Sequence, residues 1–275
     1  MDTNNDLSKL CVHTITTRNW SVAQAASGYA RAGVRGVTVW RDALTETTPA
    51  KAGDLFRRAG LTVVSLCRGG FFAHPDKASR DRALEDNRAA IMQASELGAP
   101  LMVLVCGAHP KQSLEESRRQ IAEGIQAVIP LASDLGMKLA IEPIHPMFAD
   151  SRSAVNTLKQ ANDMADAINS PFVGVAIDVY HVWWDPELER EIARCGRNKK
   201  IFAYHISDWK TPTHDMLFDR GLMGEGCIPI RKISRWVEEA GFDGFHEVEI
   251  FSHLYWKEDP TKFIDKIVAA YKSHG

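Results

Sequence analysis

Short apolar segments alternate with longer amphipathic segments along the whole chain. The apolar segments are rich in β-branched residues, as in CVHTITT at 11–17 and GVTVW at 36–40, and therefore predict strands. The amphipathic segments have the length of helices. We expect strands at 11–17, 36–40, 61–67, 101–107, 138–143, 172–179, 200–208 and 245–251. We expect helices at 21–33, 48–60, 79–98, 113–136, 155–168, 186–195, 228–241 and 259–274.

Strands that alternate with helices of this length pair in parallel. Eight such units in 275 residues favour closure into one (β/α)8 TIM barrel, which typically needs ~250 residues. No linker or low-complexity segment divides the chain, so we expect residues 1–275 to form a single domain. No Gly-x-Gly-x-x-Gly motif follows the first strand, which disfavours an open nucleotide-binding sheet.

Local signals support these boundaries. Ser113 and Glu116 have the spacing of a capping box at the start of the fourth helix. Glycine stands where several helices should stop before the next strand, because it readily adopts a left-handed conformation. These glycines are Gly33, Gly60, Gly98, Gly136 and Gly241.

Composition narrows the class of partner. The formal net charge is -2 and the sequence pI is about 6.6, which disfavours a polyanion binder such as a nucleic-acid-binding protein. The five cysteines are scattered without a CxxC pair, which disfavours disulfides and a thiolate zinc site. The N-terminus lacks a signal-peptide pattern, and no apolar run approaches the ~20 residues that span a membrane. We expect a cytoplasmic protein that acts on a small polar molecule and binds no membrane.

Ionisable residues interrupt the apolar pattern at the ends of the last four strands. Glu142 ends the fifth strand, Asp178 the sixth, and His205 stands near the end of the seventh. The eighth carries Glu247 and Glu249, two residues apart and therefore on one face. The carboxyl ends of barrel strands meet at one rim, where active sites of this fold lie.

A divalent cation explains this clustering, because bare carboxylates are costly to bury and repel one another. Any one of these residues alone is more often a salt-bridge or hydrogen-bond partner; their register at successive strand ends favours ligands. Two Glu, one Asp and one His suit Mn2+, Mg2+ or Co2+, with Zn2+ as an alternative. We favour Glu249 over Glu247 as the eighth-strand ligand because it is nearer the strand end. Glu247 is then a partner that supports the ligands.

At these residues the sequence resembles the xylose-isomerase-like superfamily of sugar phosphate isomerases and epimerases. The superfamily includes ketose 3-epimerases, inosose dehydratase and an apurinic endonuclease branch. The matching segments lie mostly in the second half of the chain. They are KLAIEPIHP (138–146), GVAIDVYHVWWDP (174–186), YHISDW (204–209), GEGCIPI (224–230) and GFDGFHEVEIF (241–251), with SLCRGGFF (65–72) in the first half.

The resemblance implies that Glu142, Asp178, His205 and Glu249 bind one Mn2+-type ion. It also implies that His181, in an Asp-x-x-His pattern with Asp178, reaches the substrate. Arg220 precedes a glycine-containing loop, as a substrate-binding arginine does in the epimerases. Barrels of this family often form dimers or tetramers, which implies a homodimer or homotetramer.

Further candidates for the substrate pocket follow from the residues themselves. His145, Arg68 and Trp183 stand in segments that follow strands, and a tryptophan at a barrel mouth offers a flat face to a sugar. Each has a plainer explanation as a packing or ion-pair residue. Asp208 is expected to orient a ligand or Lys210 rather than to bind metal.

The expected chemistry is proton transfer next to a carbonyl, through an enediolate that the metal stabilises. Glu142 and Glu249 come from strands that are not neighbours, so they are candidates to remove and return the proton from opposite faces. Isomerisation or epimerisation of a sugar or sugar derivative is the leading hypothesis. Dehydration of a keto-polyol or keto-sugar is the alternative. A phosphodiesterase of the endonuclease branch is disfavoured by the charge and the histidine spacing, and a non-catalytic barrel by the four ligands.

Overall fold

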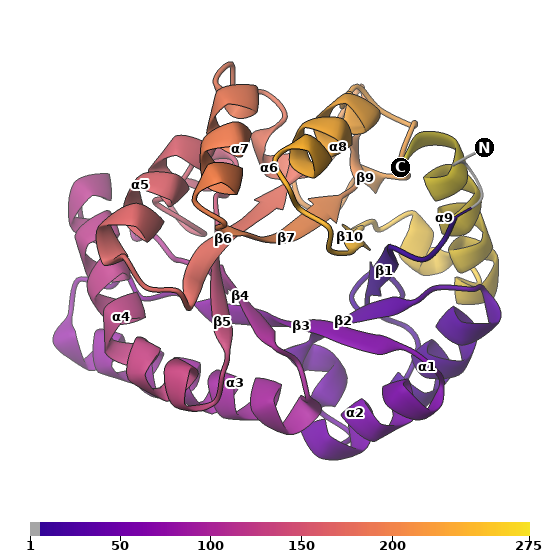
Figure 1. The fold of residues 1–275 in the computed structure, drawn as a ribbon, viewed down its shortest axis with the longest axis horizontal. Helices are drawn as coiled ribbons and strands as arrows, with labels where there is room; N and C mark the ends of the chain where they lie inside the picture. Colours follow the sequence, from indigo (N-terminus) through magenta and orange to yellow (C-terminus); the bar gives the residue numbers. More distant parts are fainter. Residues whose placement is uncertain (1–5) are drawn as a thin grey trace.

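The structure is a computed structural model that describes residues 6–275. Eight parallel strands close into a barrel in the order β1-β10-β7-β6-β5-β4-β3-β2, and helices surround it (Figure 1). The predicted TIM barrel is therefore confirmed. The strands are β1 (Leu10–His13), β2 (Gly36–Trp40), β3 (Thr62–Gly70), β4 (Leu101–Val105), β5 (Lys138–Glu142), β6 (Val173–Asp178), β7 (Ile201–Ile206) and β10 (His246–Val248).

One main helix follows each barrel strand, as the sequence pattern predicts. The helices are α1 (Val22–Arg31), α2 (Pro49–Arg58), α3 (Lys77–Leu97), α4 (Leu114–Asp134), α5 (Leu158–Ile168), α7 (Leu188–Arg197), α8 (Ile230–Glu239) and α9 (Pro260–His274). None of the helices within residues 6–275 is both long and apolar enough to cross a membrane. The first five residues, part of the stretch expected to lack a signal pattern, lie outside the described residues.

Two expected boundaries are wrong in a way that matters for the rim. The first strand ends at His13 rather than at residue 17, and the eighth ends at Val248 rather than at residue 251. The segments beyond them are loops at the carboxyl end of the barrel. Glu249 is thus the first residue after β10, although its backbone N–H still donates to the Ile206 carbonyl at 3.2 Å.

The sequence pattern also missed two short elements at this rim. A four-residue helix, α6 (Val179–Val182), begins directly after β6, and the Asp178 side chain accepts a hydrogen bond from the Tyr180 N–H at its start. A two-stranded antiparallel sheet joins β8 (Asp208–Trp209) to β9 (Arg220–Gly221). This sheet brings Arg220 back to the barrel mouth.

The helix signals are largely confirmed. The predicted glycine stops all have positive φ, for example +83° at Gly98. Ser113 caps α4 by accepting from the Glu116 N–H at 3.0 Å. The return half of the expected capping box is absent, because the Glu116 carboxylate instead pairs with Arg119 and Gln120.

The barrel interior divides into an apolar part and a polar part. Small residues from three neighbouring strands, Ala140, Ala176 and Ala203, pack with Val103 and Leu101 in the apolar part. The carboxyl ends of the strands carry the buried polar residues instead. The fold therefore positions ionisable side chains in a layer that a packed apolar layer closes from below.

Candidate metal centre

The residues predicted as ligands converge in the barrel. Each of Glu142, Asp178, His205 and Glu249 offers one ligand atom, and these atoms all lie within 4.8 Å of one another. All four residues are buried, each with at most 4% of its surface exposed. Strand register explains the convergence, because Asp178 pairs with His205 across β6 and β7, and Glu142 ends the next strand. Their role as ligands remains a prediction.

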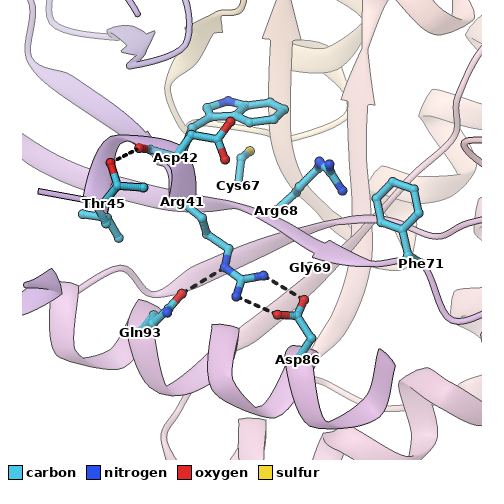
Figure 2. Close-up of a pocket in the computed structure, with 11 residues that line it drawn as sticks. Arg41, Asp42, Thr45, Cys67, Arg68, Gly69, Phe71, Asp86 and Gln93 are labelled. Carbon is cyan, nitrogen blue, oxygen red and sulfur yellow. Dashed lines mark hydrogen bonds and ion pairs between the residues drawn. The ribbon is translucent and has the colours of Figure 1, made fainter. Parts of the chain in front are cut away.

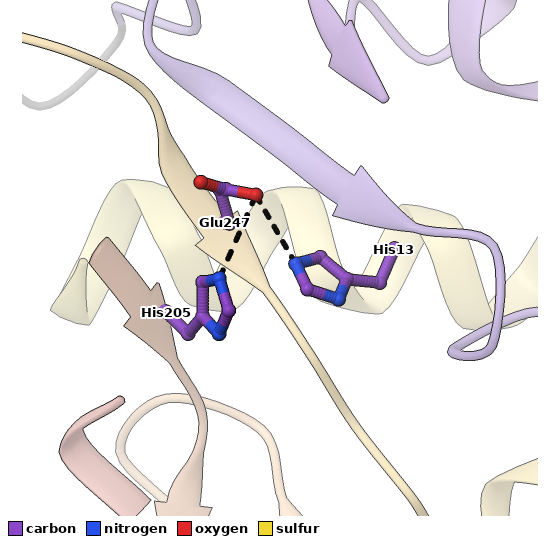
Figure 3. A group of neighbouring side chains, drawn as sticks. All are labelled: His13, His205 and Glu247. Atoms are coloured by element: carbon purple, nitrogen blue, oxygen red, sulfur yellow. Dashed lines mark hydrogen bonds and ion pairs between the residues drawn. The ribbon is translucent and has the colours of Figure 1, made fainter. Parts of the chain in front are cut away.

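Glu247 also lies in the barrel, but its contacts differ from those of Glu249. It pairs in register with His205, and its Oε2 accepts hydrogen bonds from Thr38 and, at 3.4 Å, from the Ser65 hydroxyl. The same oxygen is 3.3 Å from His13 Nε2 and 3.8 Å from His205 Nε2, so both imidazoles reach it (Figure 3). These contacts all fall on Oε2 and hold the carboxylate against both histidines, which suits a residue that supports the cluster.

The orientation of the His205 ring suits a bound cation. Its Nδ1 is 3.0 Å from Glu142 Oε1, on the side of the cluster, while Nε2 faces Glu247 without a hydrogen-bond partner. A carboxylate behind a ligating histidine fixes the ring and its tautomer. The donor set and this orientation fit a divalent ion that Glu142, Asp178, His205 and Glu249 would hold.

His13 is a site residue that sequence reasoning missed. It is buried at the end of β1, with Nδ1 2.9 Å from Glu249 Oε1 and Nε2 facing Glu247. Cys67 also lies beside it, because the ligand atoms of His13, Cys67 and Glu249 fall within 4.8 Å of one another. The one available signal was a histidine inside the otherwise apolar first strand.

Arg220 is closer to the cluster than the prediction of a substrate-binding role suggests. The side chain is 2% exposed, and its Nη1 lies 3.0 Å from Asp178 Oδ2 and 2.9 Å from Glu249 Oε2. Its Nη2 is 3.1 Å from His181 Nε2, and its guanidinium stacks over Tyr180 at 4.3 Å. His181 also lies at the cluster, with Nε2 3.6 Å from Asp178 Oδ2.

These charges shift the acid–base equilibria of the cluster. Burial raises the pKa of Asp178 to about 6, although Arg220 opposes the shift. Burial also disfavours the charged form of Glu249, but Arg220 and His13 outweigh it and hold its pKa far below the usual range. Burial opposes protonation of His205, but the Glu247 and Glu142 carboxylates raise its pKa to about 9. The protein's own cations thus compensate the carboxylates.

An aromatic cluster contains His145 and Trp183. Both rings pack against Trp209, with centroids 5.2 Å and 5.8 Å away, and Tyr180 stacks on Trp209 at 4.8 Å. Burial lowers the pKa of His145, which favours its neutral form. Trp209 itself was missed, although it follows the seventh strand directly. These residues come from segments after β5, β6 and β7 and form an aromatic wall on one side of the mouth.

Asp208 does not orient a ligand or Lys210, contrary to expectation. Its carboxylate accepts from the backbone N–H groups of Trp209, Gly224 and Ile228 at 2.8, 2.9 and 3.0 Å. Lys210 pairs instead with Asp219. Asp208 therefore holds the loop that follows β9 in place.

Arg68 lies apart from the other predicted pocket residues, in a pocket of about 460 Å³ on the β2–β3 side of the mouth. Figure 2 shows its side chain extending toward Phe71 and away from the paired Arg41 and Asp86. The four clustered residues do not line this pocket. Cys67 does, and it is the link between the pocket and the cluster.

Comparison with known proteins decides the family. The sequence profile of the xylose isomerase-like TIM barrel family matches residues 28–269. The chain belongs to this family. The structure of protein SMc04130 from Sinorhizobium meliloti 1021 is 45% identical, with a TM-score of 0.94, over 98% of this chain and 99% of that one.

Relatives of lower sequence identity include an isomerase and an epimerase. The chain is 26% identical over 259 residues to an inosose isomerase of Bacillus velezensis, covering 90% of each. It is 25% identical over 215 residues to the L-ribulose-5-phosphate 3-epimerase UlaE of Escherichia coli O157:H7, covering 75% of this chain and 70% of that protein. The structure of IolI with a zinc atom shares the fold, with a TM-score of 0.84 at 21% identity over 97% and 99% of the two chains.

Proposed function

We propose that this protein is a divalent-metal-dependent isomerase or epimerase of a sugar or sugar derivative. The observation that carries the proposal is the convergence of Glu142, Asp178, His205 and Glu249 at one buried point of the rim. The inosose isomerase and the epimerase among the relatives support the reaction class. The zinc in the IolI structure supports a bound metal in a protein of this fold, and the oxygen-rich donor set favours Mn2+.

When bound, the metal supplies Lewis acidity toward the oxygens of a hydroxy ketone. The chain's own residues then move the proton. Glu249 is the candidate base, because its carboxylate lies at the same point as the other three ligand candidates. Removal of the proton next to the carbonyl leaves an enediolate of the substrate.

Glu142 donates a proton from the other side, and exchange with water afterwards returns both carboxyl groups to their starting forms. It stands at the end of β5, which β6 and β7 separate from β10, so the two glutamates approach the same point from different strands. Return to the same carbon from the opposite face gives an epimer, and return to the neighbouring carbon gives an isomer. The aromatic wall around Trp209 excludes water from this side and offers flat surfaces to sugar C–H groups.

The disfavoured alternative, a metal-dependent phosphodiesterase of the endonuclease branch, would require a larger set of histidine ligands. Among residues 6–275, every group of three or more candidate ligands within reach of one ion draws on the residues around Glu249, Glu247 and His205. His74 and His109 face each other with ring centroids 6.4 Å apart but belong to no such group. This supports one metal rather than the larger set of the endonuclease branch.

The test is a solvent-exchange assay on metal-stripped protein supplemented with Mn2+, Mg2+, Co2+ or Zn2+. Candidate ketoses, inososes and 3-keto-glycosides are incubated in deuterated water, and deuterium incorporation and product mass are measured together. We expect metal-dependent incorporation with a product of unchanged composition. A product lighter by one water identifies a dehydratase, whereas three tightly bound zinc ions per chain would contradict the proposal.

A further inference from the structure

Arg68 and Arg152 stand at the barrel mouth. Within residues 6–275, the guanidinium groups of Arg68 and Arg152 have neither an ion-pair partner nor a hydrogen-bond acceptor. Both side chains are half-buried. Arg41, which lines the same pocket as Arg68, shows the contrast, because Asp86 holds it through two contacts of 2.8 Å.

Each unpaired guanidinium is held by an aromatic ring. Arg68 stacks over Phe71 at 4.3 Å, and Arg152 lies over Phe148 at 5.5 Å. Stacking covers the face of a guanidinium but leaves the N–H groups at its edge free to donate. The two side chains are therefore positioned without being neutralised.

The backbone brings the two arginines to the same part of the rim. The Arg152 carbonyl accepts from the Gly107 N–H at 2.8 Å, which fixes this segment beside the end of β4. On its other side, Gly107 packs so closely against Phe71 that an added Cβ would lie 2.8 Å from the Phe71 Cα. Gly107 thus lies between the backbone of Arg152 and the backbone of Phe71, whose ring contacts Arg68.

Arg152 also adjoins the cluster of ligand candidates. The Phe148 ring, over which the Arg152 guanidinium lies, contacts the His181 ring edge-on, with centroids 6.5 Å apart, and His181 contacts Arg220. Burial lowers the pKa of Arg152, and among neighbouring charges Arg68 acts on it most, followed by Arg220 and Glu249. Asp42 and Asp86 line the pocket of Arg68 and act on its charge without forming an ion pair with it. An anion that contacts both guanidinium groups would offset their mutual repulsion.

We propose that Arg68 and Arg152 together bind an anionic group, a carboxylate or a phosphate, on the substrate of the centre described above. This inference rests on the proposed function, which supplies the substrate. It narrows the substrate class from sugars in general to negatively charged sugars. Arginine suits this task because its donors match the paired oxygens of either anion. The reacting carbons then lie over the metal centre while the charged end points to the β3 side of the mouth.

The test measures anion binding directly, so it does not depend on turnover. Inorganic phosphate and acetate are titrated separately by calorimetry into wild-type protein with saturating Mn2+, at constant ionic strength. The same titrations use the double variant Arg68→Met with Arg152→Met, in which methionine keeps an apolar contact with each ring but removes the charge. Arg18→Met is the matched control, because Arg18 also stacks on an aromatic ring, that of Trp256 at 4.4 Å, yet is exposed.

We expect at least one anion to bind, with affinity at least about tenfold weaker in the double variant and almost unchanged in the control. Tighter binding of phosphate identifies a phosphate ester as the substrate, and tighter binding of acetate identifies a carboxylate. Absence of binding to the wild type, equal binding by the double variant, or an equal loss in Arg18→Met would each overturn the inference. Failure of the solvent-exchange assay alone would instead refute the proposed reaction.

Discussion

Replacement of Arg220 by methionine tests how the buried charges are balanced. The guanidinium is 2% exposed and lies about equally close to Asp178 and Glu249, at 3.0 and 2.9 Å. Methionine keeps much of the apolar contact with Tyr180 and removes the cation. Removing one partner of a buried ion pair typically costs about 3–5 kcal/mol, because the remaining charge is left without compensation.

The expected loss is large relative to the stability of a protein. A cost of about 3 kcal/mol lowers Tm by roughly 6–12 °C, at 2–4 °C per kcal/mol. A divalent ion at the cluster compensates the charge of the same carboxylates. In Arg220→Met it no longer competes with the guanidinium for them. If Arg220→Met binds Mn2+ about tenfold more tightly, saturating Mn2+ recovers about 1.4 kcal/mol of the loss.

The assay is thermal unfolding of metal-stripped protein and of protein with saturating Mn2+. Arg119→Met is the control, since Arg119 forms only exposed ion pairs, with Glu116 and Glu123, and should lose less than about 1 kcal/mol. The reasoning is refuted if the metal-free Tm of Arg220→Met stays within about 2 °C of wild type, or if Mn2+ leaves the difference unchanged.

Three further predictions concern other parts of the barrel. Glu249→Gln should abolish turnover and weaken Mn2+ binding more than Glu247→Gln, whose loss as a supporting residue should stay within about 10–100-fold; the opposite order in metal titrations would exchange the two roles. Burial lowers the pKa of His246 to about 4, so its neutral form stabilises the fold above pH 6.5 and up to roughly 3 kcal/mol is lost as the pH falls from 6.5 to 4. Denaturant unfolding at several pH values should therefore show a smaller loss in His246→Gln than in wild type, and equal losses would exclude His246 as the cause. Gly70→Ala should lower the free energy of unfolding, measured by denaturant titration, by more than about 1 kcal/mol, because φ is +109° and the new Cβ would lie 2.0 Å from the Val105 carbonyl oxygen. Gly60→Ala is the control for the effect of positive φ alone, because nothing lies within 4 Å of its new Cβ.

The sequence was sufficient for the barrel and for the convergence of four side chains. Strand and helix periods alternate without interruption, and parallel closure then places the ends of successive strands at one rim. Glu142, Asp178 and His205 each interrupt an apolar strand near its end, so register alone brings them together. The hydrophobic pattern of the sequence and the barrel topology thus both predict that these side chains converge.

Residues outside a periodic element could not be placed in this way. Arg152 stands in a loop, and its position depends on the bridge to Gly107, which is a contact between distant segments. The depth of Arg220 depends on the pairing of β8 with β9, each only two residues long. His13 had a signal, but a single histidine in an apolar strand is equally typical of a satisfied core residue.

The choice between Glu247 and Glu249 follows from the alternation of the strand. Residues two apart point to the same face, so both carboxylates enter the barrel at different depths. The lower one, Glu247, meets the hydroxyls of Thr38 and Ser65, which are fixed donors with no route to the mouth. The upper one, Glu249, forms ion pairs with His13 and Arg220, whose charges a metal ion can replace. Depth therefore separates a carboxylate that holds the histidines in place from one that is available for exchange with metal and substrate.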